Sequence, residues 1–415
     1  MTSNSHKEAF VWIWLPGETQ PVVAGRLEAG NGNVRFSYGQ SYLERIGDSK
    51  AAISIYEPEL PLKTGGFVKS TMPGCIRDAS PDSWGRRVII NKLLGRKGAG
   101  TDTAELDELT YLLESGSDRI GALDFQRSPT EYIPRVTGNV SMEALIESAD
   151  RVEKGLLLTA ELDQALFNAS SIGGARPKAL IQDSDKKYVA KFSSGTDLYS
   201  VVKAEYIAMR LAALAGLQVA PVKLTQAANK DVLLIERFDR IPKDDQWTRK
   251  VMVSALTLLG MNDMTARYAS YETLAEAIRH RFTNPKDTLK ELFSRLVFNI
   301  LCGNTDDHAR NHAAFWNGKE LTLTPAYDIC PQSRTGNEAS QGMLIFGSNN
   351  LSQLNTCLMT ANNFLLSETD ARAIFKHLTE TIKQYWDTVC EEAELSETDK
   401  NLLWSRQFLN PYATE

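Results

Sequence analysis

Cysteine is scarce in this 415-residue sequence, and its few positions form no recognisable site. The residues are far apart and lack the CxxC spacing of redox and zinc motifs: Cys75, Cys302, Cys330, Cys357 and Cys390. An odd number of separated cysteines argues against a disulfide framework and favours packed thiols in a reducing compartment. We therefore expect a cytoplasmic protein.

Long apolar runs are also missing. The N-terminal stretch AFVWIWL contains seven apolar residues before Pro16. A membrane-spanning helix needs ~20 such residues, and a secretion signal needs a cleavage site as well. We therefore expect no membrane association.

The sequence has no excess of positive charge, because 46 Lys and Arg residues face 52 Asp and Glu, for a net charge of −6. Proteins that bind nucleic acid unaided need many basic contacts to phosphate. Direct DNA binding is not expected, although a local basic patch or a basic partner stays open. The hydrophobic content of 42% is ordinary for a globular protein.

The residue patterns predict an α+β chain of three units. Residues 1–135 begin with short β-branched and aromatic runs between Gly, Pro and Asn, which predict a β-rich mixed unit. Residues 136–240 have the order loop, strand, strand, helix, strand. Residues 241–415 are dominated by helical periodicity, with a hairpin predicted around Asn317 and Gly318.

Residues 303–311, GNTDDHARN, crowd polar groups directly after an amphipathic helical stretch. Asp306 and Asn311 have the spacing of the catalytic aspartate and metal-binding asparagine of protein kinases. Asp328 follows the predicted hairpin, where kinases have a second metal-binding residue. Phosphoryl transfer needs a carboxylate near the hydroxyl, oxygen ligands for Mg²⁺ and fixed cations beside ATP. These three residues and Lys191 would supply them.

A glycine-rich segment, SSIGGARPK, lies upstream at residues 170–178. Backbone N–H groups of Gly173 and Gly174 could approach phosphate closely, and Lys178 could add positive charge. The segment matches neither the Walker A nor the protein-kinase glycine pattern. An ordinary hairpin turn is the alternative.

Two further positions fit a kinase order. Lys191 in YVAKF resembles the strand lysine that holds ATP phosphates, and Glu205 on the next helix could pair with it. Backbone groups from Glu236 to Phe238 would then reach adenine. The alternatives are a solvent-facing lysine, an unrelated helical glutamate and an ordinary strand end.

Other interpretations of the polar loop stay open. His308 and His312 are four residues apart, which on a helix would put both beside Asp306 and Asp307 and suit a transition metal. No HExxH or paired HD signature accompanies them. A solvated loop is also possible, but it does not explain why these motifs follow one another in kinase order.

The motif PDSWGRR begins at Pro81. Arg86 and Arg87 could contact a substrate or partner. The structural alternative is a proline at a helix start, a packed Trp84 and arginines that pair with acids.

Together, NTDDHARNHAAFWNGKELTLTPAYDI, SSIGGARPKALI, VAKF, ERFDR and PDSWGRR resemble the HipA family of bacterial toxin kinases over nearly the whole chain. The resemblance implies a two-lobed kinase-like fold with an extra N-terminal subdomain and a helical C-terminal lobe. It implies ATP and Mg²⁺ as cofactors. The implied partners are a HipB-like helix-turn-helix antitoxin, operator DNA bound through it, and a protein substrate, an aminoacyl-tRNA synthetase.

The resemblance also implies individual roles. Asp306 would be the catalytic base, with His308 bracing its loop and Lys191 on the phosphates. The other implied positions are the phosphate loop at Gly173, Gly174, Ala175 and Lys178, the adenine contacts at Glu236 and Phe238, the magnesium ligands Asn311 and Asp328, and autophosphorylation at Ser171, with Ser170 as its competitor. Phosphorylation there would eject the loop and switch the kinase off.

Two positions depart from the family pattern. Asp307 stands where glycine is often found and could repel or bind a metal. Pro177 removes one N–H donor from the phosphate loop. A small-molecule phosphotransferase and a non-catalytic co-repressor scaffold are the alternative functions.

Overall fold

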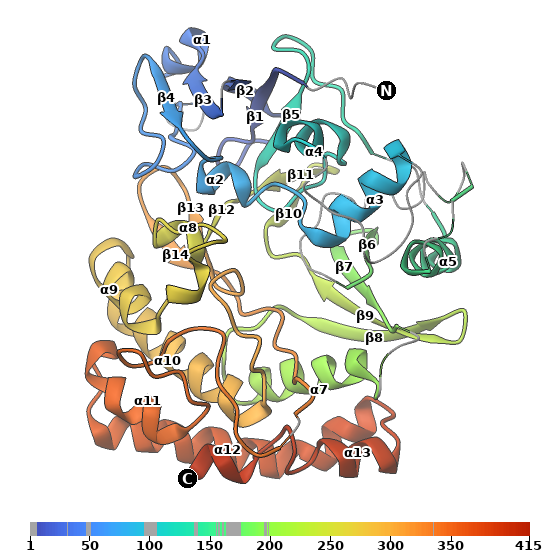
Figure 1. The fold of residues 1–415 in the computed structure, drawn as a ribbon, viewed down its shortest axis with the longest axis vertical. Helices are drawn as coiled ribbons and strands as arrows, with labels where there is room; N and C mark the ends of the chain where they lie inside the picture. Colours follow the sequence, from blue (N-terminus) through green and yellow to red (C-terminus); the bar gives the residue numbers. More distant parts are fainter. Residues whose placement is uncertain are drawn as a thin grey trace.

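The computed structural model describes residues 6–30, 32–46, 51–94, 106–136, 140–154, 156, 158, 159, 162, 176–194, 197, 199–334 and 336–415 (Figure 1). Four sheets and a predominantly helical C-terminal region make up this part of the chain. No helix among these residues is long and apolar enough to cross a membrane.

The N-terminal sheet is antiparallel, with the order β4-β3-β2-β1-β5. Its strands are β1 (Glu8–Ile13), β2 (Val22–Gly30), β3 (Asn33–Tyr38), β4 (Gly66–Lys69) and β5 (Leu123–Gln126). The short helices of this region are α1 (Gln40–Leu43), α2 (Gly74–Arg77) and α4 (Glu108–Glu114). The β-rich start predicted from short apolar runs is therefore present.

A second antiparallel sheet, β6-β7-β9-β8, forms the core of a smaller lobe. Its strands are β6 (Lys178–Gln182), β7 (Lys187–Phe192), β8 (Val222–Ala227) and β9 (Lys230–Glu236). The sequence prediction missed β8, which makes a tight hairpin with β9. Ala228 and Asn229 turn that hairpin with φ values of 47° and 59°, the conformation of a type I′ turn.

Helices cover both faces of this sheet. Val232 and Leu234 pack with α3 (Ser83–Leu94) and α5 (Met142–Glu153), whereas Leu233 and Ile235 pack with the face of α7 (Val201–Leu214). This alternation is the period-2 pattern of a strand buried on both sides. Helix α3 therefore joins the core of the smaller lobe although it precedes that sheet by more than 80 residues (Figure 1).

The C-terminal lobe is built on long helices, as expected, but it is not wholly helical. Its helices are α8 (Ala255–Leu258), α9 (Tyr271–Arg281), α10 (Pro285–Cys302), α11 (Leu354–Thr360), α12 (Glu368–Glu392) and α13 (Glu397–Leu403), with 3₁₀ turns η2 (Ala266–Tyr268), η3 (Ala361–Phe364) and η4 (Pro411–Thr414). A sheet β12-β13-β14 also belongs to it, formed by Val251–Ser254, Ala313–Trp316 and Leu321–Leu323. The predicted hairpin supplies β13 and β14, and β12 pairs with β13.

The predicted turn at Asn317 and Gly318 is confirmed, and a capping box starts the longest helix. Gly318 has φ +97° in the β13–β14 turn, where the Asn317 side chain accepts the backbone N–H groups of Lys319 and Glu320. Ser367 forms a capping box with Asp370 at the start of α12. A further hairpin, β10 (Arg240–Lys243) with β11 (Gln246–Arg249), connects the two lobes.

Candidate active site

The polar loop is positioned by the end of α10. Gly303 follows the helix with φ +72°, a left-handed conformation that favours glycine. A Cβ atom at this position would lie 2.7 Å from the carbonyl oxygen of Gln407. The Gly303 carbonyl accepts the N–H of Gln332 at 3.0 Å. The loop thus begins at a glycine that both the turn and its packing require.

Lys191 lies at the centre of the candidate site. Its Nζ donates to Glu205 Oε1 at 2.6 Å and also to Asp328 Oδ1. Lys191 and Glu205 are buried in β7 and α7, whereas Asp328 follows β14 with a side chain that is 43% exposed. Residues from three separate elements therefore meet at one ammonium group, in the arrangement expected from the kinase order.

Asp328 and Asn311 lie together beside this lysine. The Asn311 Nδ2 donates to Asp328 Oδ2 at 3.3 Å. Asp328 has φ +60°, which is unusual for a residue with a side chain and is a form of strain concentrated at functional sites. The Lys191 ammonium holds the pKa of Asp328 well below its usual range, and the Lys178 charge adds to this effect. Asp328 is therefore a carboxylate at neutral pH.

Asp306 is exposed at the edge of the same site. Partial desolvation raises its pKa, the positive charge of His308 opposes this rise, and the negative charges of Asp328 and Asp307 add to it. A raised pKa suits a general base, provided that the carboxylate is still ionised at the working pH. Asp306 is thus accessible to an incoming hydroxyl group.

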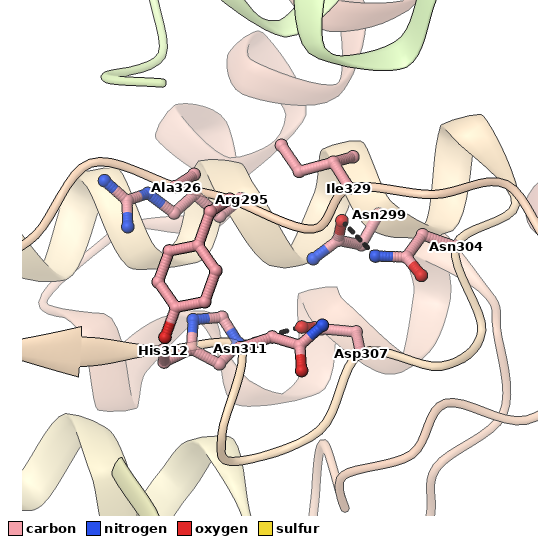
Figure 2. Close-up of a pocket in the computed structure, with 9 residues that line it drawn as sticks. Arg295, Asn299, Asn304, Asp307, Asn311, His312, Ala326 and Ile329 are labelled. Atoms are coloured by element: carbon pink, nitrogen blue, oxygen red, sulfur yellow. Dashed lines mark hydrogen bonds and ion pairs between the residues drawn. The ribbon is translucent and has the colours of Figure 1, made fainter. Parts of the chain in front are cut away.

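Asp307 points away from that surface. It is 1% exposed, it accepts a hydrogen bond from the Tyr271 hydroxyl, and its Oδ1 lies 2.9 Å from His312 Nε2 (Figure 2). Burial acts to raise its pKa, but the His312 charge and these hydrogen bonds lower it overall. The aspartate that replaces the usual glycine therefore anchors the loop from beneath.

The two histidines do not converge on one point. His312 is buried against Asp307, whereas His308 is exposed and its backbone carbonyl accepts the Asn311 N–H at 2.8 Å. The side chain that contacts the loop core is that of Asp307 rather than that of His308. Within the described ranges, no group of three or more His, Cys, Asp or Glu side chains could hold a metal ion. The pair of histidines on one helix face, on which the transition-metal interpretation depended, is therefore not formed.

The phosphate-loop candidates are only partly visible. Ser171, Gly173, Gly174 and Ala175 lie outside the described residues, as does Ser170. Lys178 opens β6 beside Lys191 of β7 and is buried. Burial lowers its pKa, as does the Lys191 charge, and Asp82 and Asp328 oppose them.

The predicted adenine contacts lie where β9 ends. The Glu236 N–H donates to the Pro221 carbonyl at 2.9 Å, and the Glu236 side chain pairs with Lys186 at 2.7 Å. The Phe238 ring lies 5.9 Å from Phe315 and 5.7 Å from Tyr327. An adenine contact would therefore use the Glu236 carbonyl or groups of Phe238 rather than the Glu236 amide.

A buried ionic network fixes this inter-lobe segment to the N-terminal region. Arg237 and Arg240 both pair with Asp118 and Asp239, and the Gly121 N–H donates to Asp239 Oδ2 at 2.8 Å. The arginine charges hold the pKa of Asp118 well below normal and lower that of Asp239 to about 2, although burial acts in the opposite direction. The sequence motif ERFDR was recognised, but its partner around Asp118 was not.

The arginines of PDSWGRR contact other side chains of the same chain. Arg86 makes two bonds of 2.7 Å to Glu108 and lies 4.4 Å from the Tyr111 ring centre. Arg87 lies 5.5 Å from the ring centre of Trp84, which is fully buried. Arg86 therefore has the structural role given as the alternative.

Sequence reasoning missed two asparagines near this site. Asn304 is buried and donates to Asn299 Oδ1 at 3.1 Å, and it approaches the Asp328 carbonyl at 3.5 Å (Figure 2). These contacts tie the segment that carries Asp328 to α10. Asn299, a polar residue within the apolar run LVFNILC at the end of α10, was the available signal.

Comparison with known protein families shows to which family the chain belongs. The HipA-like C-terminal domain matches residues 170–386, and the HipA N-terminal domain matches residues 14–126. The chain belongs to the HipA family. Its curated relatives are named as kinases, one of them as a serine/threonine-protein kinase, and the chain is a kinase of that family.

Three relatives illustrate the similarity. The putative kinase Y4mE of Sinorhizobium fredii is 24% identical over 347 residues, which cover 76% of each chain. The serine/threonine-protein kinase toxin HipA of Shewanella oneidensis is 25% identical over 185 residues, which cover 38% of this chain and 42% of that one. The structure of the Shewanella oneidensis HipA, HipB and operator DNA complex superposes with a TM-score of 0.71 at 18% identity, covering 98% and 99%. That likeness confirms the two-lobed HipA fold.

The donor set of this HipA-family chain suits ATP and a divalent metal. Asp328 and Asn311 offer carboxylate and amide oxygens, the ligands that Mg²⁺ prefers. Lys191 and Lys178 place two ammonium groups next to that pair, where phosphate charge would lie.

Proposed function

We propose that this chain is an ATP- and Mg²⁺-dependent protein serine/threonine kinase that acts in the cytoplasm as the toxin of a type II toxin–antitoxin pair. The observation that carries the proposal is the convergence of Glu205 and Asp328 on the Lys191 ammonium, with Asn311 beside Asp328. A kinase needs this lysine and this acid in place together. The convergence also disfavours a decayed, non-catalytic scaffold.

Each residue of the site has a distinct task. Lys191, oriented by Glu205, would bind the α- and β-phosphates. Asp328 and Asn311 would hold Mg²⁺, which neutralises charge on the phosphates when it is bound. The exposed Asp306 would accept the proton of the attacking hydroxyl group.

We propose autophosphorylation as the means of control, because of the place of Ser171 in the sequence. Ser171 belongs to the glycine-rich segment that leads into Lys178. A phosphoserine carries roughly −1.5 to −2 charges, and it would compete with ATP for Lys178 and Lys191. We propose that phosphorylation of Ser171 switches the kinase off.

The partners follow from the same family. The Shewanella relative is described in complex with HipB and operator DNA, and we propose a HipB-like antitoxin for this chain. A net charge of −6 agrees with DNA contact being delegated to that partner. We propose an aminoacyl-tRNA synthetase as the protein substrate.

Phosphosite mass spectrometry tests the proposal. The purified protein is incubated with Mg²⁺ and ATP beside its Asp306→Asn variant. Phosphate on Ser171 in the wild type only is the expected result. An unmodified wild type that binds ATP and phosphorylates no protein would instead favour a small-molecule phosphotransferase, and one that hydrolyses no ATP would favour a scaffold.

A further inference from the structure

The start of α3 contacts the beginning of the phosphate-binding strand. The Trp84 indole Nε1 donates to the backbone carbonyl of Lys178 at 3.2 Å, and both residues are buried. Lys178 is the first residue of β6, directly after the glycine-rich segment, and it lies opposite Lys191 in the β6–β7 ladder. The tryptophan thus holds the backbone of a residue that faces the candidate nucleotide site.

The position of β6 explains why this bond matters. Among the described strands, β6 lies at the edge of its sheet and pairs with β7, so the backbone groups on its other edge are open to donors from outside the described sheet. A buried carbonyl without a donor costs free energy. Trp84 supplies that donor to the Lys178 carbonyl, and Figure 1 shows α3 running beside β6 and β7.

Packing fixes the tryptophan itself. The Trp84 ring is fully buried in a cluster with Ala179, Ala190 and Phe192, on the strands that carry Lys178 and Lys191. Because buried rings in a close-packed core have few alternative rotamers, the indole N–H has a fixed direction. Movement of α3 would therefore move the start of β6.

The residue preceding α3 is also coupled to the site. Lys178 and Arg310 attract the Asp82 carboxylate and Asp328 repels it, although burial is the largest influence and raises the Asp82 pKa. Lys178 belongs to the smaller lobe, and Arg310 and Asp328 belong to the C-terminal lobe. The carboxylate that precedes α3 therefore lies within electrostatic range of charged side chains from both lobes, Lys178 on one side and Asp328 on the other.

We propose that α3, which belongs to the N-terminal region, is part of the nucleotide site, with Trp84 as the positioning residue that fixes Lys178 for ATP phosphate. This inference rests on the proposed kinase function. It assigns the functional role of the PDSWGRR motif to its tryptophan rather than to its arginines. It also makes ATP affinity sensitive to anything that displaces α3.

The test is Trp84→Phe, which keeps an aromatic ring and removes the N–H. The matched control is Trp14→Phe, because the Trp14 Nε1 donates to the Thr19 carbonyl at 3.0 Å from a similarly buried ring that directly follows β1. A net hydrogen bond is worth about 0.5–1.5 kcal/mol. We expect the dissociation constant for Mg²⁺ and a fluorescent N-methylanthraniloyl ATP to rise roughly 3- to 10-fold in Trp84→Phe only.

A kinetic comparison separates positioning from general damage. Trp84→Phe should raise the KM for ATP while kcat at saturating ATP stays near the wild-type value. Equal affinity in Trp84→Phe and wild type, or an equal loss in both tryptophan variants, would overturn the inference. A wild type that binds no nucleotide would overturn the proposed function itself.

Amide hydrogen exchange tests the inference on the wild-type protein, so the result does not depend on whether a variant folds. Mg²⁺ and ATP should slow amide exchange in α3 as well as in β6 and β7, with no change in β2 and β3. Protection of β6 and β7 without any protection of α3 would show that the helix is not part of the nucleotide site.

Discussion

Lys191 Nζ donates to Glu205 Oε1 at 2.6 Å in a pair that is almost fully buried. Because Lys191 also contacts Asp328, the Glu205 charge helps to decide where the ammonium lies. We expect Glu205→Gln to lower kcat/KM for ATP roughly 10- to 100-fold, the scale of losses from small misplacements. Steady-state kinetics measures this, and Glu392→Gln, which breaks an exposed pair with Arg210, should leave kcat/KM unchanged.

Adjacent aspartates should give opposite phenotypes. Asp306→Asn removes an exposed carboxylate, so phosphoryl transfer should fall about 10²- to 10⁴-fold with little change in the free energy of unfolding. Asp307→Asn disturbs the buried contacts with Tyr271 and His312 and should cost about 1.5–3 kcal/mol of stability. Urea unfolding and a transfer assay on both variants check the contrast. Similar unfolding curves for the two variants would contradict it.

The pH dependence of activity should reflect the pKa of Asp306. Its pKa is raised, so the acidic limb of kcat/KM should lie above the value of ~3.9 for an ordinary aspartate. His308 lowers that pKa, and His308→Gln should therefore move the limb to higher pH. Rates between pH 4 and 8 measure the shift, and a limb that stays in place or moves to lower pH would refute the electrostatic role of His308.

The ionic network between the lobes should stabilise the fold, and this contribution should be lost at acid pH. The pKa of Asp239 is lowered to about 2, below the unfolded value of ~3.9. Its contribution is therefore complete above about pH 4 and disappears as the pH falls toward 2, and it amounts to about 2 kcal/mol. The stability difference between wild type and Asp239→Asn should shrink over this range in chemical denaturation. A difference independent of pH would exclude this linkage.

The meeting of Lys191 with Glu205 and Asp328 could be predicted from sequence because phosphoryl transfer restricts both residue type and order. Asp306, Asn311 and Asp328 are close in sequence, and the Asn317–Gly318 turn between them is a strong local signal. Lys191 and Glu205 occupy consecutive elements. These residues follow one another along the chain in the order found in kinases, and this order identified them together where no single motif would have done so.

Features that depend on distant contacts could not be predicted. Strand β12 has four residues and no periodicity of its own, and pairing with β13 defines it. The role of Asp307 depends on Tyr271, which lies on α9. Trp84 reaches a backbone carbonyl 94 positions away. In each case, tertiary packing outweighed the local pattern.

Transfer of labelled γ-phosphate from ATP to protein tests the central claim most directly. Wild type, Asp306→Asn and Asp328→Asn are compared with Asp263→Asn, which loses only an exposed pair with Arg310. We predict labelling in the wild type and in Asp263→Asn, and its loss in the other two variants with their fold retained. Equal labelling of all four proteins would contradict the assignment of this site as a kinase centre.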